Sequence, residues 1–440
     1  MNFINTLKDI WKIEELKNKI LLTLGLIAVY RFMAGVPLPG IDPLQLAALK
    51  DSTQGGLLGL LNAFTGGAFS RASIMALGIM PYISASIVVQ LMGIAVPYLQ
   101  KLQKDGESGR KKITQITRWL TILITMVQGP TYITAIKTQF GLPAEAFLVT
   151  GPTFWISSMI LLTAGTIFAM WLGERITDKG VGNGISLLIT VGIIANFPAA
   201  FLQEFFAKTT NAGAGGIMMI LIEIIIWFVV ILLSVYLVTA VRKIAVQYAR
   251  RTVAGNIQNV AGSREYIPLK LNAAGVMPII FAQAIMFLPA YIGQKYPALA
   301  ELQDINGLWY NVLFAFLIIV FSYFYTAITI PTNKMAEDLK RSGGFIPGIR
   351  PGKDTADRLD TVLSRITFPG SLFLAGLSIL PAIVVQFGVQ QSWALFYGGT
   401  SLIIMVGVAI DTIQQVNSYL LNRHYDSLMK TGTSNRKSSK

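Results

Sequence analysis

The sequence has no cysteine and only one histidine, His424, among its 440 residues. The absence of cysteine excludes disulfides and thiolate metal sites, and because the single histidine lies in the polar tail, no histidine-based metal centre or catalytic triad is expected. Charged residues are also scarce, because they make up 13% of the chain against about 25% in soluble proteins. These shortages point away from an enzyme and away from a bound metal or cofactor.

Long apolar runs dominate the rest of the sequence. Hydrophobic residues make up 53% of the chain, and the mean hydropathy is +0.58. A run of about 17 to 25 apolar residues is long enough for a helix to cross a bilayer, and ten such runs occur. They lie at about residues 20–36, 74–97, 119–138, 153–172, 184–204, 217–240, 271–292, 308–330, 368–388 and 393–412. The sequence therefore predicts an all-α integral membrane protein with ten transmembrane helices and with both termini on one side.

The ten predicted spans divide into two groups of five. If the two halves are related, an odd number of spans in each half forces opposite orientations, which is the inverted-repeat arrangement of many transport proteins. Both halves contain a glycine closely followed by a proline, Gly78 and Pro81 in the first and Gly275 and Pro278 in the second. We expect a central path between the halves. The predicted segments are an amphipathic interfacial helix at 1–19, the first half at 20–210, the second half at 211–412 and a tail at 413–440.

The distribution of lysine and arginine predicts the orientation. Thirty of the 36 Lys and Arg residues lie in the terminal segments and in the loops on the same side, and five lie on the other side. By the positive-inside rule both termini are expected in the cytoplasm. The two longest loops, 241–270 and 331–367, are on this side. Loops of this length are often functional, so they are candidate docking surfaces for a cytoplasmic partner rich in RNA or acidic groups.

The stretch from Gly55 to Gln90 is apolar but has too many interruptions for an ordinary span. It contains five glycines before Ser70, one arginine, Arg71, and a bend at Gly78 and Pro81. Irregular backbone at membrane depth is tolerated only where protein or a water-filled cavity satisfies its polar groups. The stretch therefore predicts a short re-entrant helix followed by a kinked span, and it indicates a pore or a transport path.

The candidates for an ionisable group buried within the spans are few, namely Arg31, Glu223 and Asp411. Ion-coupled transporters usually bury such groups, but all three are expected near span ends or at the interface, so an ion relay is not favoured. The glycines of KGVGNG, residues 179–184, lack the spacing of a phosphate-binding loop and predict a tight turn. A small-solute transporter and a membrane scaffold without a pore both stay open at this point.

Pairs of isoleucines occur near the bends. Ile79 and Ile83 are four residues apart on the second span, and Ile185 and Ile189 repeat this spacing on the fifth. Residues four apart lie on one face of a helix, and a narrow apolar ring would resist wetting and block ions. Isoleucine is common in any membrane helix, so the spacing alone does not assign a pore lining.

Six motifs, in order from end to end, resemble the SecY family of bacterial protein-conducting channels. They are GGAFSRASIMALGIMPYISASIVVQL, KDGESGRKKITQITRW, MWLGERITDKGVGNGIS, PLKLNAAGVMPIIFA, FYTAITIPTNKMAEDLKRSGGFIPGIRPGKDTADRLD and FYGGTSLIIMVGVAID. The resemblance covers nearly the whole chain. It implies a channel in the bacterial plasma membrane that passes unfolded secretory polypeptides across and releases membrane segments laterally into lipid.

The resemblance also assigns roles to individual residues. The pore ring comprises Ile79, Ile83, Ile185, Ile189, Ile280 and Ile404. The plug, a short helix at about 57–70 that closes the pore, includes Leu57, Leu58, Leu60, Leu61, Asn62 and Phe64, with Arg71 just after it. The polar residues of the lateral gate are Ser84, Gln90 and Asn272. Arg350, with Arg250 and Arg251 in the companion loop, is expected to dock a cytoplasmic partner.

The partners implied by the resemblance supply what the chain lacks. They are the SecA motor ATPase and the ribosome, small membrane subunits like SecE and SecG, signal sequences, unfolded polypeptide substrates and membrane lipid. No nucleotide-binding motif occurs in the sequence, so the work of transport is expected to come from such a motor or from translation.

Overall fold

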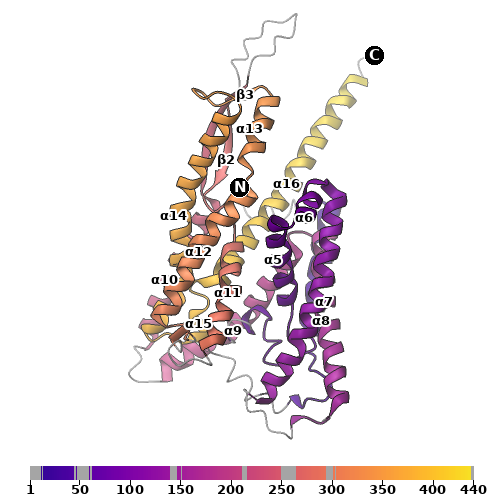
Figure 1. Ribbon diagram of the computed structural model, residues 1–440, viewed down its shortest axis with the longest axis vertical. Coiled ribbons are helices and arrows are strands. Elements are labelled where there is room, and N and C mark those ends of the chain that lie inside the picture. The colour runs from indigo at the N-terminus through magenta and orange to yellow at the C-terminus, as the bar shows by residue number, and fades with distance from the viewer. Residues whose placement is uncertain are drawn as a thin grey trace, which may run out of the picture. The chain divides into compact units, whose positions relative to one another are not determined.

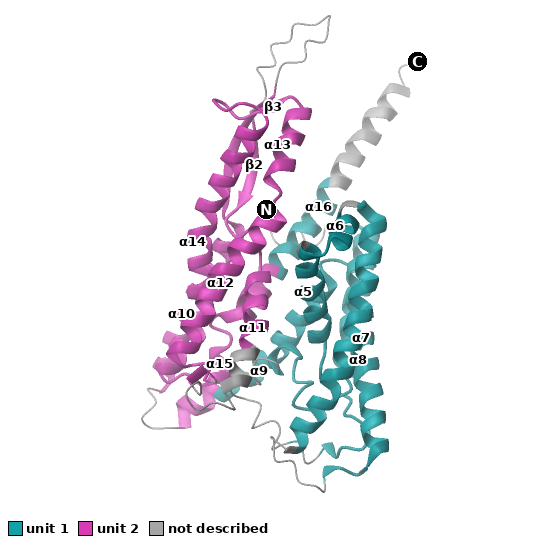
Figure 2. Ribbon diagram, viewed as in Figure 1, with its two compact units in different colours: residues 1–203, 408–440 teal, residues 204–407 magenta. Residues whose placement is uncertain are grey.

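The structure is a computed structural model, and it is mostly helical (Figure 1). The described residues are 11, 13–43, 46, 59, 62–138, 146–149, 151–210, 216–248, 264–293, 301, 302 and 304–437. The chain forms two compact units, residues 1–203 with 408–440 and residues 204–407 (Figure 2). The division between the units falls near the predicted boundary of the halves at residue 210, although the end of the chain returns to unit 1.

Unit 1 is a bundle of helices. Its helices are α2 (Glu14–Met33), α5 (Met80–Ala95), α6 (Pro97–Lys104), α7 (Gly106–Thr138), α8 (Pro152–Lys179), most of α9 (Gly184–Thr210) and most of α16 (Gly399–Lys437). Helix α7 packs against α5, α6 and α8, and α2 packs against α8. Apolar residues before and after the plug, such as Leu38 and Ala72, share a buried core with Ile133 of α7 and Leu162 of α8.

Unit 2 combines long helices with a small sheet. Its elements are α10 (Gly216–Thr239), β1 (Val241–Tyr248), β2 (Arg264–Lys270), α11 (Met277–Gly293), α12 (Leu308–Thr329), α13 (Thr332–Arg341), β3 (Gly344–Phe345), α14 (Lys353–Gln386) and α15 (Gln391–Ala394), with the last residues of α9 and the first of α16. Helix α14 packs against α10, α12, α13 and α15.

The helices support the membrane fold. Among the described residues seven helices are long and apolar enough to cross a bilayer, and the bent pair α5 and α6 adds an eighth candidate. Helices α2 and α11 cover the two remaining predicted spans. Each of the ten predicted spans therefore coincides with a helix over most of its length.

The second predicted span differs from expectation at both ends. Helix α5 begins at Met80, not at residue 74, because Gly78 has a positive φ of 52° and Pro81 occupies the first turn. Its last turn ends where Val96 is extended, with φ −100° and ψ 113°. The residue before a proline avoids helical geometry, so Pro97 explains the 101° bend between α5 and α6.

A three-stranded antiparallel sheet joins the two long loops, which the sequence had left without secondary structure. The strand order is β2-β1-β3, with Val241 opposite Lys270 and Gln247 opposite Phe345. Val246 of β1, Leu339 of α13 and Leu359 of α14 form a small buried core beneath it. Loops 241–270 and 331–367 are thus one cap with its own core, not two separate surfaces.

Candidate functional site

The six predicted ring isoleucines lie at the beginnings of four helices. Ile79 directly precedes α5 and Ile83 lies in its first turn, where the Ile83 N–H donates to the Ile79 carbonyl oxygen at 3.1 Å. The other four lie within the first two turns of α9, α11 and α16, and they are Ile185, Ile189, Ile280 and Ile404. Ile79, Ile189 and Ile404 are buried. Ile280 and Ile404 belong to unit 2, and the convergence of all six stays a prediction.

A glycine with positive φ accompanies the start of each of these helices. The φ angles are 52° at Gly78, 86° at Gly182, 63° at Gly275 and 63° at Gly399. Glycine adopts this conformation at little cost, so these four residues determine where the helices begin. They thereby determine the level at which each isoleucine lies on its helix.

Two of these helix starts repeat one sequence pattern. Gly78 to Ile83 reads GIMPYI, and Gly275 to Ile280 reads GVMPII. In each copy the helix begins at the methionine, the proline lies in the first turn, and a predicted ring isoleucine ends the motif. The pattern G-x-M-P-x-I is a signal for the ring that reasoning from isoleucine spacing missed.

The KGVGNG segment forms the tight turn between α8 and α9 that its glycines predict. The Val181 N–H donates to Thr23 Oγ1 of α2 at 3.1 Å, and the Gly182 N–H donates to Gln415 Oε1 of α16 at 2.8 Å. Asn183 Oδ1 accepts a hydrogen bond from the Ile185 N–H at 3.2 Å, as an N-terminal cap does. The turn is therefore clamped by α2 and α16, and the clamp positions Ile185.

Apart from Gly59, the plug region is described from Asn62 onward, and Leu57, Leu58, Leu60 and Leu61 lie outside the described residues. Asn62 closes a compact loop, because its carbonyl accepts from the Gly67 N–H at 2.9 Å and its Oδ1 accepts from the Ser70 N–H at 3.0 Å. Residues 63–70 are all buried. This part of the plug is therefore a compact loop held by its own hydrogen bonds.

The plug loop is also held from outside. Tyr132 Oη of α7 donates to the Phe69 carbonyl oxygen at 2.7 Å, and Arg31 Nη1 of α2 donates to the Gly66 carbonyl oxygen at 2.9 Å. A charge-assisted bond of this kind is stronger than a neutral one. Arg31, which the sequence placed near a span end, is half-buried and anchors the plug, whereas Arg71 is exposed.

Helix α9 comes very close to the plug loop at a pair of glycines. A Cβ atom on Gly192 would lie 2.6 Å from the Phe64 carbonyl oxygen and 3.1 Å from the Gly66 nitrogen. A Cβ atom on Gly66 would in turn lie 2.9 Å from the Cα atom of Gly192. Only glycine at both positions allows this approach, so the wall of the predicted pore and the plug fit together without side chains between them.

The predicted gate residues lie in different settings. Ser84 and Gln90 are on α5, where Gln90 Nε2 donates to Ser86 Oγ of the same helix at 3.3 Å. Asn272 was expected within a span, but it lies in the turns before α11, because Gly275 and Pro278 delay the start of that helix. Asn272 belongs to unit 2, and a gate that joins it to Gln90 stays a prediction.

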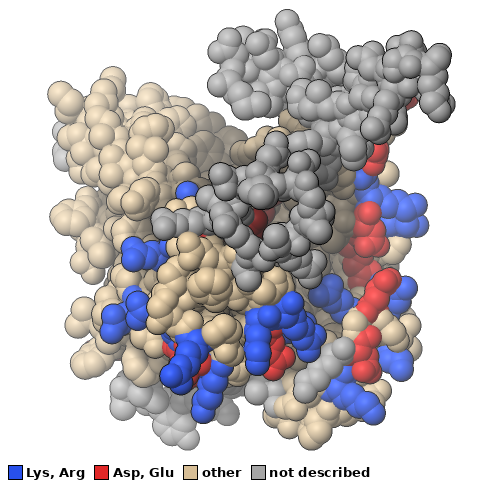
Figure 3. Space-filling view, turned by 90° about the horizontal axis from the view of Figure 1, so that it is seen from above, with Lys and Arg blue, Asp and Glu red and all other residues tan. Residues whose placement is uncertain are grey.

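Arg350 lies exposed on the cap of unit 2, in the short connection between β3 and α14. Its carbonyl oxygen accepts a hydrogen bond from Thr355 Oγ1 at 2.8 Å, and Pro351 follows it. The backbone is therefore fixed while the exposed guanidinium can reach a partner. Figure 3 shows Lys and Arg side chains on the face seen from above, with acidic residues among them. Arg250 and Arg251 lie outside the described residues.

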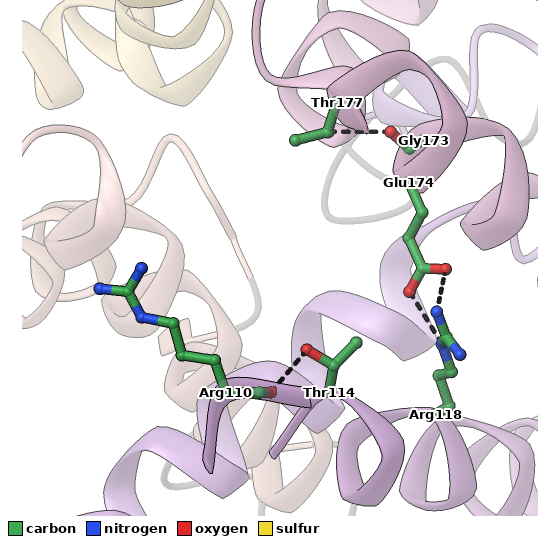
Figure 4. A network of polar contacts seen from close by, with 6 residues as sticks. All are labelled: Arg110, Thr114, Arg118, Gly173, Glu174 and Thr177. Carbon is green, nitrogen blue, oxygen red and sulfur yellow. Dashed lines mark hydrogen bonds and ion pairs between the residues drawn. The ribbon is translucent and has the colours of Figure 1, made fainter. Parts of the chain in front are cut away.

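An ion pair joins α7 to α8 beside the KGVGNG turn (Figure 4). Arg118 Nε and Nη2 donate to the two carboxylate oxygens of Glu174 at 3.0 and 2.6 Å. One turn further along α8, Thr177 Oγ1 donates to the Gly173 carbonyl oxygen at 2.9 Å and accepts from the Gly184 N–H at 2.9 Å. The bidentate pair of Arg118 and Glu174 stabilises the end of α8 from which the KGVGNG turn leads into α9.

We expect the Arg118 and Glu174 side chains to be coupled by about 1 kcal/mol, the upper end for partly exposed pairs. A double-mutant cycle of Arg118→Met and Glu174→Gln, read by reversible unfolding in detergent, measures the coupling. The Lys111 and Glu107 pair, whose side chains are 76% and 85% exposed, serves as the control and should give about 0.3–0.5 kcal/mol. Equal coupling in the two cycles would contradict the stabilising role.

Comparison with known proteins decides the family. The SecY family model matches residues 73–413. The chain is 39% identical to protein translocase subunit SecY of Streptomyces coelicolor, over 96% of this chain and 98% of that one. It is 38% identical to the same subunit of Aquifex aeolicus, over 96% and 99%. This chain belongs to the SecY family. It is therefore a channel subunit of a protein translocase.

Solved SecY and Sec61 structures share the fold of this family member. A SecY structure determined to study its plug domain has a TM-score of 0.61 at 19% identity, with 91% of each chain covered. Sec61 in a canine ribosome-channel complex has a TM-score of 0.55 at 17% identity, also with 91% of each chain covered. These likenesses confirm the predicted helical channel fold.

Proposed function

We propose that unfolded secretory polypeptides cross the bacterial plasma membrane through a pore whose narrowest part is the ring of six isoleucines. The observation that carries this proposal is the placement of all six at helix starts marked by glycines of positive φ. Apolar side chains can yield around an extended chain, and an empty apolar constriction resists wetting by ions and water. The ring thus seals the pore and admits a substrate without recognising its sequence.

The plug supports a closed resting state. Arg31, Tyr132 and the contact between Gly66 and Gly192 all hold the plug loop in place. In the SecY protein of similar fold, the plug domain stabilises the closed state and maintains a membrane seal. We infer the same role here. A signal sequence opens the channel only by binding the open state more tightly than the closed one, and it then leaves through a lateral gate near Gln90 and Asn272.

We further propose that both termini and the cap of unit 2 lie in the cytoplasm. The 30 to 5 distribution of lysine and arginine supports this orientation. In that orientation Arg350 faces a motor like SecA or the ribosome, and a Sec61 channel of similar fold is seen in complex with a ribosome. Small subunits like SecE and SecG would cover part of the exposed apolar helices, with lipid covering the rest.

The domain organisation follows from the same reasoning. We propose inverted five-span halves at 20–210 and 211–412, preceded by an interfacial helix at 1–19 and followed by a cytoplasmic tail at 413–440. The repeat of G-x-M-P-x-I at Gly78 and Gly275 supports a common origin of the halves. Family membership decides against the small-solute transporter and the scaffold without a pore.

The absence of native cysteine makes the pore directly testable. We expect Ile83→Cys and Ile189→Cys each to form a disulfide with a cysteine in a secretory chain stalled during translocation. Ile156→Cys serves as the control, because that side chain is 58% exposed on the outside of α8 and should not react with the substrate. If neither ring position forms the disulfide in an active channel, the proposed pore is wrong.

A further inference from the structure

Three ionisable side chains are buried together in unit 2, apart from the proposed pore. Glu204 and Lys208 lie in the last turns of α9, and Glu223 lies in α10, with only 2%, 6% and 3% of their surfaces exposed. Lys208 Nζ lies 3.6 Å from Glu204 Oε1 and 3.4 Å from Glu223 Oε1. The sequence had placed Glu223 near the interface, but the structure buries it.

The cluster contains one positive group and two negative ones. Within the described part of the chain, Lys208 is the only cationic partner of either carboxylate. If all three groups were ionised, one negative charge would be buried without compensation, which costs several kcal/mol even in a relaxed protein interior. A buried carboxyl group in this position takes up a proton instead.

The surroundings identify which carboxyl group does so. Glu204 Oε2 accepts a hydrogen bond from the Gln390 N–H at 2.9 Å, and a backbone donor of this kind compensates part of the cost of burying a carboxylate. Among the described residues neither oxygen of Glu223 accepts a hydrogen bond, although Lys208 Nζ lies 3.4 Å from its Oε1. Lys208 Nζ lies at similar distances from both carboxylates, so the hydrogen bond from Gln390 marks Glu204 as the one whose charge is compensated, and Glu223 carries the excess charge or loses it.

A second observation comes from Tyr397, which lies just before the start of α16. Its side chain is 1% exposed, and its hydroxyl donates no hydrogen bond within the part of the chain that the structure describes. The phenol lies close enough to interact electrostatically with both Glu223 and Glu204. The titratable groups that face Glu223 are thus Glu204 and Lys208 from α9 and Tyr397 from the chain before α16. None of these adds a positive charge beyond that of Lys208.

We propose that Glu223 is a proton-binding site that stays protonated at neutral pH beside the ion pair of Glu204 and Lys208. The cluster then has no net charge. It also ties together three segments, because Lys208 Nζ donates to the Gly388 carbonyl oxygen at 2.9 Å, Glu204 accepts from Gln390 in the same connection, and Glu223 extends from α10. Loss of the proton places two carboxylates against one ammonium and weakens this junction.

Infrared spectroscopy of the full-length protein in lipid vesicles tests the proposal at pH 7.5. We expect a protonated carboxyl carbonyl band that shifts in deuterated water. Glu223→Gln removes the band, and Glu204→Gln also removes it, because the remaining carboxyl then pairs one-to-one with Lys208. Lys208→Met increases it about twofold, since both carboxyl groups lose their counterion. Glu174→Gln, at a carboxylate already paired with Arg118, leaves the band unchanged.

The responses of the variants distinguish a bound proton from a bound metal cation, which is the competing way to balance the charge. A wild-type protein without the band, or a band that survives both Glu223→Gln and Glu204→Gln, would overturn the proposal. If the band is absent and sodium chloride, compared with choline chloride, raises the thermal stability of wild type but not of Glu223→Gln, the site binds sodium and the proposal is wrong. Since the readout is spectroscopic, it is independent of transport.

Discussion

Replacing Arg350 with glutamate is expected to abolish motor-driven translocation while the protein still folds and inserts. The side chain is exposed, and its backbone is fixed by Thr355, so the substitution changes the docking surface without disturbing a core. Arginine residues at the centre of an interface often contribute at least about 2 kcal/mol, which corresponds to about a 30-fold loss of affinity. Reversal of the charge adds repulsion, and transport into vesicles with a purified motor measures the loss.

The control for this experiment lies on the same cap. Arg358, in the second turn of α14, is also exposed, and Arg358→Glu makes the same change in net charge. We expect Arg358→Glu to keep most of its transport activity. Equal loss in both variants would show a general effect of charge, and normal transport by Arg350→Glu would contradict the docking role.

A valine at Gly192 is expected to displace the plug and make the resting channel conduct ions. Its Cβ would lie 2.6 Å from the Phe64 carbonyl oxygen, a contact that cannot be accommodated unless the plug loop or α9 moves. Overpacking of this kind costs about 1–3 kcal/mol, and each 1.4 kcal/mol changes an equilibrium about tenfold. The closed state should therefore lose about 5- to 150-fold in population relative to the open state. Conductance in planar bilayers measures the leak.

Gly25→Val provides the matched control, because a Cβ atom at Gly25 of α2 would meet no atom within 4 Å. This variant should remain as tight as wild type. Gly192→Ala should leak less than Gly192→Val, because the smaller side chain still forces the first contact but adds no branches. A well-inserted Gly192→Val channel that stays closed to ions would show that the plug loop does not form the seal.

The helices were predictable from the sequence because each predicted span is an apolar run bounded by charged or glycine-rich segments. Local chemistry also predicted the interruptions, as Gly78 and Pro81 show. The sheet was not predictable in the same way. Strand β3 has only two residues, and it pairs with β1 about 100 positions earlier. No periodicity develops over two residues, and a pairing at this distance depends on how α12 and α14 return the chain to the cap.

The same contrast holds for the candidate site. The isoleucines could be proposed as a pore ring from the resemblance of the sequence to a family. Their positions at helix starts could have been found from the G-x-M-P-x-I pattern. The contact between Gly66 and Gly192 could not, since a glycine in a membrane helix has many uses and nothing in the sequence shows which backbone it meets. The environment of Glu223 was predicted from its position along a span, whereas its burial depends on Lys208 and Glu204 on another helix.

The clamp on the KGVGNG turn also constrains the order in which the protein can be assembled. The Gly182 N–H finds its acceptor on Gln415, 233 residues later in the chain. At about 5–20 residues per second of synthesis, this acceptor is made about 12 to 47 s after the turn. Until then the turn before Ile185 lacks one of its two clamps. A chain that stops short of α16 therefore leaves unit 1 incomplete, and the first half cannot reach its final form ahead of the last helix.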